Sequence, residues 1–305
     1  MYSKVEGLPD ASITDPTVPY QDGTAFFING PRIHEYHKEM CKYMLSQIPE
    51  GKEIMTVGEV GIGNEDDFRV YTSAKEGELN MMFKFKHTSV DEKPKCKYEL
   101  IPFTLKDFKQ ALAESFLFIE NTDCWSTIYL ENHDQPRSVS RFGSDSEKMK
   151  KFFEALDLTF RDHGRTPFPR NDDEPSAGFS KDAKPWIDIN ESFRDGINAE
   201  AELNDKDSVF FFWKKALQVR KEHKDILVYG HNFQFIDLDN DKLFMFTKDT
   251  DNKKMFAVFN FSSDKTDFPV PDEGASYTMF FGNYADSNGK SRTLQPWEGR
   301  LYLLK

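Results

Sequence analysis

The hydrophobic pattern of this chain changes near residue 225, and that change limits the folds open to it more than any other feature. Before this point, segments with helical spacing alternate with short apolar runs, which is typical of an α/β arrangement. After it, short aromatic runs recur between turns of Asp, Asn, Gly and Pro, which is typical of a small antiparallel sandwich. With 305 residues, each part is long enough to bury a core. We therefore predict two domains, residues 1–224 and 225–305.

The first part predicts helices that alternate with strands. Apolar residues at helical spacing predict a helix over 33–48, and Thr104 followed by Asp107 resembles a capping box that opens another helix. The remaining expected elements are a buried strand over 53–57, further strands over 81–86 and 125–130, a helix over 147–160, and a helix capped at Asp207 or Ser208.

The second part predicts five strands, over 233–236, 243–247, 255–261, 277–281 and 299–304. The helix before them, from Val209 to about His223, carries an apolar stripe that includes Phe212 and Trp213. Such a stripe needs an apolar partner. We expect the sandwich to supply it through the aromatic faces of Phe233, Phe235, Phe244 and Phe246.

Composition excludes several classes of function. A net charge of −12 repels nucleic acid and anionic membrane surfaces. No apolar stretch reaches the roughly 18 residues of a membrane-spanning helix. The three cysteines are too few and too far apart for a disulfide framework, and the first residues do not read as a signal peptide. A cytoplasmic protein without nucleic-acid or membrane partners is expected.

Acidic residues follow two of the expected strands. Glu59 comes two residues after the strand 53–57, and Asp134 follows the strand 125–130. In parallel barrels, polar groups at the carboxyl ends of strands line the active site, and a pair of carboxyls there suits glycosidic bond cleavage. The alternative is that both acids cap the next helix. Spacing alone favours this capping interpretation.

Other chemical motifs are weak. Gly61-Ile62-Gly63 lacks the third glycine of a dinucleotide loop because position 66 is Asp. His34 and His37 do not have the spacing of a zinc protease, so we interpret them as packed or solvated side chains. No Gly-x-Ser-x-Gly elbow supports an esterase. No metal site and no cofactor is expected.

Two segments resemble motifs of glycoside hydrolase family 13, in the α-amylase superfamily. Glu53–Val60 (EIMTVGEV) resembles the fifth-strand motif of its α-glucosidases, and Glu131–Gln135 (ENHDQ) the seventh-strand motif. Further segments occur in the same order in fungal maltases and isomaltases: Asn29–Tyr36, Ile101–Leu105, Arg161–Pro167 and Pro296–Arg300. The resemblance covers essentially the whole chain, which is identified as a member of this family.

The resemblance implies a role for each matching residue. Glu59 would be the general acid/base, and Asp134 would stabilise the oxocarbenium-like transition state. His133 would bond the same sugar ring, and Arg165 would anchor sugar and carboxylate groups. The implied partner is a small-molecule α-glucoside or oligosaccharide. The chemistry needs no cofactor and no metal.

The chain also departs from the family pattern. The nucleophilic Asp of the fourth strand, in a Gly-Phe-Arg-x-Asp context, is absent, and so are the first four strands. A second gap lies between residues 143 and 149, where the family has its eighth strand, and position 170 is Arg where the family favours Trp. The expected fold is therefore a partial TIM (β/α)8 barrel, about strands five to seven, followed by a C-terminal antiparallel β-sandwich. The chain would be N-terminally truncated and internally shortened.

Two functions are compatible with these departures. The chain is either an α-glucosidase known here as a fragment, inactive alone because the nucleophile is missing, or a non-catalytic carbohydrate-binding or regulatory relative, or a pseudogene product. An in-frame Gly-Phe-Arg-x-Asp just upstream in the genomic DNA would favour the first. The preference for α-1,4 or α-1,6 linkages is not readable, because the stretch after the nucleophile is absent.

Overall fold

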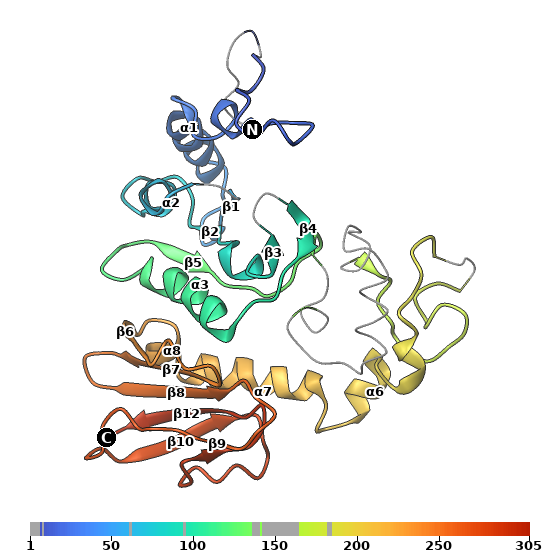
Figure 1. Ribbon diagram of the computed structural model, residues 1–305, viewed down its shortest axis with the longest axis vertical. Coiled ribbons are helices and arrows are strands. Elements are labelled where there is room, and N and C mark those ends of the chain that lie inside the picture. Colours follow the sequence, from blue (N-terminus) through green and yellow to red (C-terminus); the bar gives the residue numbers. More distant parts are fainter. Residues whose placement is uncertain are drawn as a thin grey trace. The chain divides into compact units, whose positions relative to one another are not determined.

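The computed structural model describes residues 7, 9–60, 63–93, 96–135, 141, 165–181 and 185–305 (Figure 1). Contacts divide the chain into two compact units that do not follow chain order. Unit 1 comprises Met1–His87 with Ala111–Ile128, and unit 2 comprises Thr88–Gln110 with Tyr129–Lys305. The domain boundary at 224/225 stays a prediction. Among the described residues, no helix is long and apolar enough to cross a membrane.

Unit 1 is built on a three-stranded parallel sheet in the order β1-β2-β5. Its central strand is buried through Met82, which packs with Phe68 of α2 and with Phe118. Lys84, one residue beyond β2, lies over both of these rings and bonds the carboxylate of Glu65 at 3.0 Å. The elements of this part are η1 Thr24–Phe26, α1 Ile33–Leu45, β1 Val57–Glu59, α2 Glu65–Thr72, β2 Met81–Phe83 and β5 Trp125–Thr127. Two more elements, η2 Lys86–Thr88 and α3 Leu105–Leu117, are divided between the units, and α3 belongs to unit 2 as far as Gln110.

Two helix starts follow from local side-chain bonds. Thr104 and Asp107 form the expected capping box before α3, because each side chain accepts the backbone N–H of the other. Asn64 and Asp67 form a second capping box before α2. The helix α2 was not expected, although its Asn-x-x-Asp start is visible in the sequence.

The three expected strands of the first part exist, but one was placed too early in the chain and two were placed too broadly. The strand expected over 53–57 is β1 at Val57–Glu59, and those over 81–86 and 125–130 end at Phe83 and Thr127. β1 is an edge strand, and Ile54 and Met55 before it are exposed rather than buried. The apolar residues at 53–57 suggested a buried strand, but a strand at the edge of a three-stranded sheet is not buried. The helix expected over 147–160 lies outside the described residues.

Unit 2 ends in a five-stranded antiparallel sheet in the order β10-β12-β8-β7-β6 (Figure 1). All five expected strands are confirmed, whereas the two-residue strands β9 and β11, which pair with each other, were not expected. The elements are β3 Glu92–Lys93, β4 Cys96–Leu100, η4 Glu191–Asp195, α6 Ala199–Asn204, α7 Val209–Glu222, α8 Lys224–Leu227, β6 His231–Ile236, β7 Leu243–Asp249, β8 Lys254–Asn260, β9 Thr266–Asp267, β10 Tyr277–Gly282, β11 Thr293–Leu294 and β12 Gly299–Leu304.

Both faces of the five-stranded sheet are covered, which explains its nearly continuous apolar strands. On one face, Met245 and Phe256 pack with Phe268 and Leu294 from around β9 and β11. On the other face, Ile226 of α8 packs with a second set of alternate strand residues: Met255, Ala257, Phe246, Phe259, Leu301 and Leu303. Strand side chains alternate between the faces, so both sets bury apolar surface.

The helix α7 contacts the sheet as expected, but through other rings. Phe212 lies 5.5 Å from Phe281 of β10, measured between ring centroids, and His223 lies 4.6 Å from Phe280. Trp213 is 60% exposed, so it does not join this contact. The four aromatic residues expected to receive the helix instead stack on one another: Phe233, Phe235, Phe244 and Phe246. The expected partners were wrong because periodicity does not say which strand of a sheet a helix meets. Phe281 belongs to β10, at the edge of the sheet opposite to β6.

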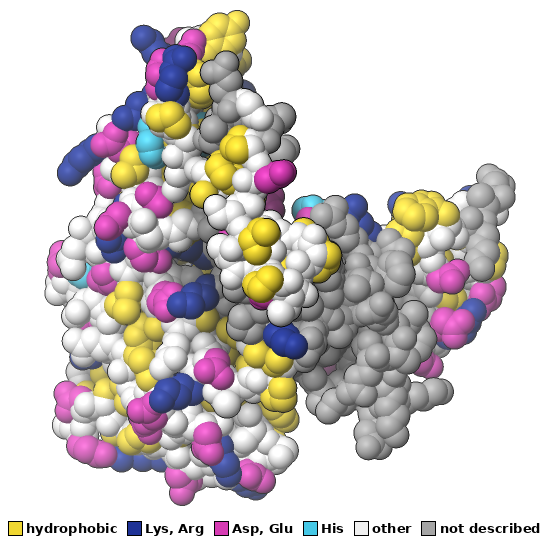
Figure 2. All heavy atoms as spheres, turned by 45° about the horizontal axis from the view of Figure 1, so that its top comes forward, with side chains coloured by type: hydrophobic (Ala, Val, Ile, Leu, Met, Phe, Trp, Pro, Cys, Tyr) yellow, Lys and Arg dark blue, Asp and Glu magenta, His cyan; other side chains and the backbone are white. Residues whose placement is uncertain are grey.

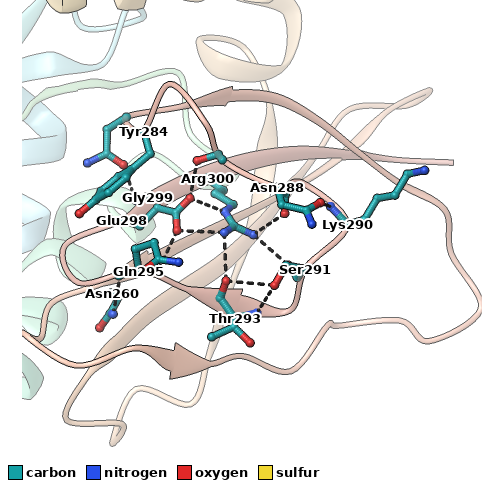
Figure 3. A network of polar contacts seen from close by, with 12 residues as sticks. Asn260, Tyr284, Asn288, Lys290, Ser291, Thr293, Gln295, Glu298, Gly299 and Arg300 are labelled. Atoms are coloured by element: carbon teal, nitrogen blue, oxygen red, sulfur yellow. Dashed lines mark hydrogen bonds and ion pairs between the residues drawn. The ribbon is translucent and has the colours of Figure 1, made fainter.

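Two buried cationic side chains stabilise turns of unit 2 by hydrogen bonds. Lys109 of α3 donates hydrogen bonds to the carbonyls of Asp237, Asn240 and Leu243, in the turn between β6 and β7. Arg300 of β12 lies at the centre of a polar network around Glu298 (Figure 3). Both side chains are almost fully buried, so each turn is held by a cation that has exchanged water for protein oxygen atoms.

Candidate functional site

Glu59 lies at the carboxyl end of the edge strand β1, in unit 1. Register pairs Glu59 with Phe83, and Phe83 with Thr127, so the three strands end at one edge of the sheet. Met82 faces the helices, so the neighbouring position in the alternation, occupied by Glu59 and Phe83, faces away from them. The Glu59 side chain is exposed and makes no hydrogen bond or ion pair with other described residues.

The strand also shows why a glycine precedes Glu59. A Cβ atom built on Gly58 would lie 2.5 Å from the Leu79 side chain and 3.2 Å from that of Met82. The helix-facing side of β1 therefore has no room for a side chain. Glycine lets β1 approach this layer closely, and Glu59 takes the open side.

Asp134, His133 and Arg165 form one polar cluster in unit 2. Arg165 Nη2 donates to Asp134 Oδ1 at 2.6 Å, and Arg165 Nε donates to the His133 carbonyl at 2.8 Å. His133 Nε2 lies 3.6 Å from Asp134 Oδ2. Arg165 therefore binds the carboxylate and the adjacent backbone through two separate N–H groups, whose spacing is fixed by the planar guanidinium.

This cluster is open to solvent. The side chains of Asp134 and Arg165 are 33% and 41% exposed, and that of His133 is 66% exposed. A partly exposed carboxylate held beside an arginine and an imidazole can accept hydrogen bonds from hydroxyl groups, while the cation donates to them. The arrangement is suited to a polyhydroxylated ligand.

The structure thus brings together His133, Asp134 and Arg165, as expected. Glu59 lies in the other unit, and its closeness to Asp134 stays a prediction. In the described part of the chain, Asp134 does not cap a helix, and neither does Glu59. The capping interpretation is therefore wrong for Glu59, because Asn64 caps the next helix, α2. For Asp134 it stays a prediction, since residues 136–140 lie outside the described part of the chain.

Asp134 lies in a turn formed by residues 132–135, which we call the Asp134 turn. Sequence reasoning missed the residues that contact this turn on the side away from Arg165. Asn132 Oδ1 accepts the Asp134 backbone N–H at 2.9 Å, and Gln135 Nε2 donates to the Thr88 carbonyl at 3.3 Å. Arg141 bonds the same carbonyl at 2.6 Å. The Asn-x-Asp spacing is a local turn signal that could have identified Asn132. Nothing in the sequence pairs Thr88 with residues so distant along the chain.

His34 and His37 are packed against other side chains, as we interpreted them. His34 Nδ1 lies 3.0 Å from the buried Glu78 carboxylate, and His37 Nδ1 lies 3.4 Å from it. Both imidazole rings also lie against Tyr71. Among the described residues, no group of three or more His, Cys, Asp and Glu side chains is arranged to hold a metal ion.

Known proteins match this chain over most of its length. The family described as "Alpha amylase, catalytic domain" matches residues 1–160 and 143–230. Oligo-1,6-glucosidase IMA5 of Saccharomyces cerevisiae is 76% identical over 368 residues, and alpha-glucosidase MAL12 of the same yeast is 42% identical over 369. Each match includes 100% of this chain but 63% of the relative. The chain therefore spans less than two thirds of the length of these relatives.

The length of the alignment also shows an internal difference. The aligned stretch of IMA5 exceeds the 305 residues of this chain, so the relative has additional residues inside it. The two family matches overlap at residues 143–160, a range that includes the gap predicted between 143 and 149.

Among solved structures, trehalose-6-phosphate hydrolase of Bacillus licheniformis superposes with a TM-score of 0.81 at 27% identity, covering 94% of this chain and 62% of that one. The trehalulose synthase MutB of Pseudomonas mesoacidophila shares the fold, with a TM-score of 0.79 at 23% identity and coverage of 91% of this chain and 59% of that one.

Proposed function

Because the chain belongs to the α-amylase family, we propose that the Asp134 cluster binds the sugar ring of an α-glucoside at the scissile bond. The ion pair between Arg165 and Asp134 supports this proposal most directly, since it joins residues 31 positions apart at a solvent-open carboxylate. The Nη1 atom of Arg165 makes no hydrogen bond with other described residues, so it can donate to a ligand hydroxyl.

In the proposed complex, Asp134 accepts hydrogen bonds from ring hydroxyls, and His133 and Arg165 donate to them. The carboxylate also opposes the positive charge that an oxocarbenium-like transition state develops. Glu59 would act as the general acid/base, which requires its carboxyl group to reach the glycosidic oxygen. Hydrolysis with retention further requires a nucleophile, and we found no matching Asp in the chain.

The maltase-like or isomaltase-like preference remains part of the proposal. IMA5, at 76% identity, is named an oligo-1,6-glucosidase, which supports an isomaltase-like ligand, but MAL12 at 42% identity is named an alpha-glucosidase. We also propose a cytoplasmic location, which fits the free thiols of Cys41 and Cys124. Acidic and basic side chains are intermixed on the face drawn in Figure 2, and the described Lys and Arg residues there form no broad basic patch that would suit nucleic acid.

The second candidate is a non-catalytic sugar-binding protein. The solvent-exposed pair of Asp134 and Arg165 supports sugar binding whether or not hydrolysis follows. Both candidates use the Asp134 cluster, and they differ only in turnover.

Binding and turnover are tested separately. We expect the purified 305-residue chain to bind an iminosugar analogue of glucose weakly by calorimetry, and Asp134→Asn to abolish the heat signal. Arg292→Lys, at an exposed ion pair with Glu273, is the matched control and should leave binding unchanged. No hydrolysis of p-nitrophenyl α-glucoside, maltose or isomaltose is expected. Turnover that disappears on Glu59→Gln would show a working enzyme and refute the expected inactivity, and binding that survives Asp134→Asn would refute the site.

A further inference from the structure

A buried ion pair lies behind the Asp134 turn and takes no part in the proposed chemistry. The side chains of Arg141 and Asp91 are 3% and 5% exposed. Arg141 Nε donates to Asp91 Oδ2 at 3.0 Å, and Arg141 Nη2 bonds the other carboxylate oxygen. Apolar residues can often replace a buried ion pair without loss of stability. Stability alone therefore does not explain why this pair is buried here.

The pair is connected to the turn through one backbone carbonyl. The Thr88 carbonyl accepts from Arg141 Nη2 at 2.6 Å and from Gln135 Nε2 at 3.3 Å, and Thr88 is fully buried. Gln135 is the residue directly after Asp134. The carbonyl is thus shared between the buried ion pair and the proposed sugar-binding turn, and all of these residues lie in unit 2.

The turn itself is closed by Asn132. Its Oδ1 atom accepts the Asp134 N–H at 2.9 Å, which fixes the backbone that carries the carboxylate. Arg165 then holds the same turn from the solvent-exposed side. The direction of the Asp134 carboxylate therefore depends on contacts on both sides of the turn.

We propose that Arg141, paired with Asp91, is a positioning residue for Asp134. Its guanidinium fork binds the carboxylate and the Thr88 carbonyl together, and Thr88 in turn receives Gln135. The geometry makes Arg141 act through Thr88 and Gln135, without touching the ligand. The importance of Arg141 for sugar binding rests on the proposed function, whereas its effect on the turn does not.

The test measures the turn without any ligand. Hydrogen exchange, followed by mass spectrometry on the full chain, reports the backbone of residues 129–135, and nitrogen-detected NMR reports the Arg165 Nε–H that is bonded to the His133 carbonyl. Arg141→Lys keeps the positive charge but lacks the planar guanidinium that binds Asp91 and the Thr88 carbonyl together. The turn should then open more often, so we expect roughly tenfold faster amide exchange in this segment. We also expect a displaced Arg165 Nε–H resonance. Exchange in β7 and β8 should remain unchanged.

Two further variants complete the design. Gln135→Ala removes the link to Thr88 and leaves the buried pair intact, so it should reproduce both changes even if Arg141→Lys does not fold. Arg292→Lys alters an exposed bidentate ion pair with Glu273 in the same unit, and it should change neither signal. An unchanged Arg165 resonance and unchanged exchange at 129–135 in Gln135→Ala would overturn the proposal. Because no sugar is used, loss of the proposed function would leave this result standing, and failure here would leave sugar binding to be judged by calorimetry.

Discussion

Replacement of Arg300 by Met should strongly destabilise the C-terminal sheet. The Arg300 side chain bonds both oxygens of Glu298, at 2.7 and 2.9 Å, and neither side chain is more than 2% exposed (Figure 3). It also donates to the carbonyls of Asn288, Ser291 and Thr293 at 3.0, 2.8 and 3.0 Å. Methionine would leave one carboxylate and three carbonyls without this donor.

The magnitude follows from that list of lost partners. Removal of one member of a buried ion pair costs about 3–5 kcal/mol. At about 2–4 °C per kcal/mol, we expect the melting temperature to fall by roughly 6–20 °C. Chemical denaturation followed by circular dichroism gives the free energy of unfolding. Arg292→Met, which removes an exposed arginine from its pair with Glu273, serves as the control and should change it little.

The loss should also depend on pH in a definite direction. Burial raises the pKa of Glu298, but hydrogen bonds from Arg300 and Ser287 outweigh burial and hold this pKa below its ordinary value. The depressed pKa stabilises the fold above the unfolded value of about 4.3, and this contribution is lost as pH falls through the folded pKa. Without Arg300, burial dominates, so the variant should approach the wild type as pH falls from 7 to about 3. A loss below about 1 kcal/mol at pH 7, or one that does not shrink with acid, would refute the reasoning.

The remaining predictions concern buried lysines and the two acids. Lys109→Met should lower the free energy of unfolding by about 3 kcal/mol, because three buried carbonyls lose their donor. Lys106→Met, at an exposed ion pair with Asp239, is the control and should change the free energy of unfolding little. Equal losses in the two denaturation curves would contradict this prediction. Burial lowers the pKa of Lys84 below its ordinary value of 10.5, so the unfolded chain binds this proton more tightly than the folded chain. The free energy of unfolding of the wild type should therefore rise with pH just below 10.5, and that of Lys84→Met should not. Parallel pH profiles of the two proteins would disprove this. A crystal structure of the chain should place the carboxyl groups of Glu59 and Asp134 within about 10 Å, and carboxyls that emerge at opposite ends of the sheet would end the catalytic assignment of Glu59.

Local signals predicted the fold where neighbours in sequence decide it. The strand expected over 299–304 is β12 at Gly299–Leu304, and the capping box at Thr104 opens α3. Alternation and capping depend on residues only a few positions apart, so a sequence pattern can carry them. The strand expected over 53–57 failed because its apolar residues lie at an edge that no described strand covers.

The site divides in the same way. The resemblance to the glycosidase motifs identified His133, Asp134 and Arg165 one by one, because a sequence motif can be recognised without a structure. Their meeting, the ion pair that joins Arg165 to Asp134, depends on how the chain returns after 31 residues. The scaffold behind the turn was not expected at all, because Asp91 and Arg141 are 50 residues apart and each alone resembles a surface charge.

By itself, the sequence determined the family, the α/β and antiparallel character of the two parts and most strand positions of the C-terminal sheet, and it named the residues that we propose to bind a sugar. Periodicity, turn residues and motif letters are local properties, so they are present before the chain folds. The tertiary structure alone decided that both faces of the C-terminal sheet are covered, that Lys109, Arg141 and Arg300 are buried cations, and that Arg165 holds Asp134. Burial and ion pairing are set by which distant segments pack together, and a charged residue reads the same in the sequence whether water or a carboxylate surrounds it.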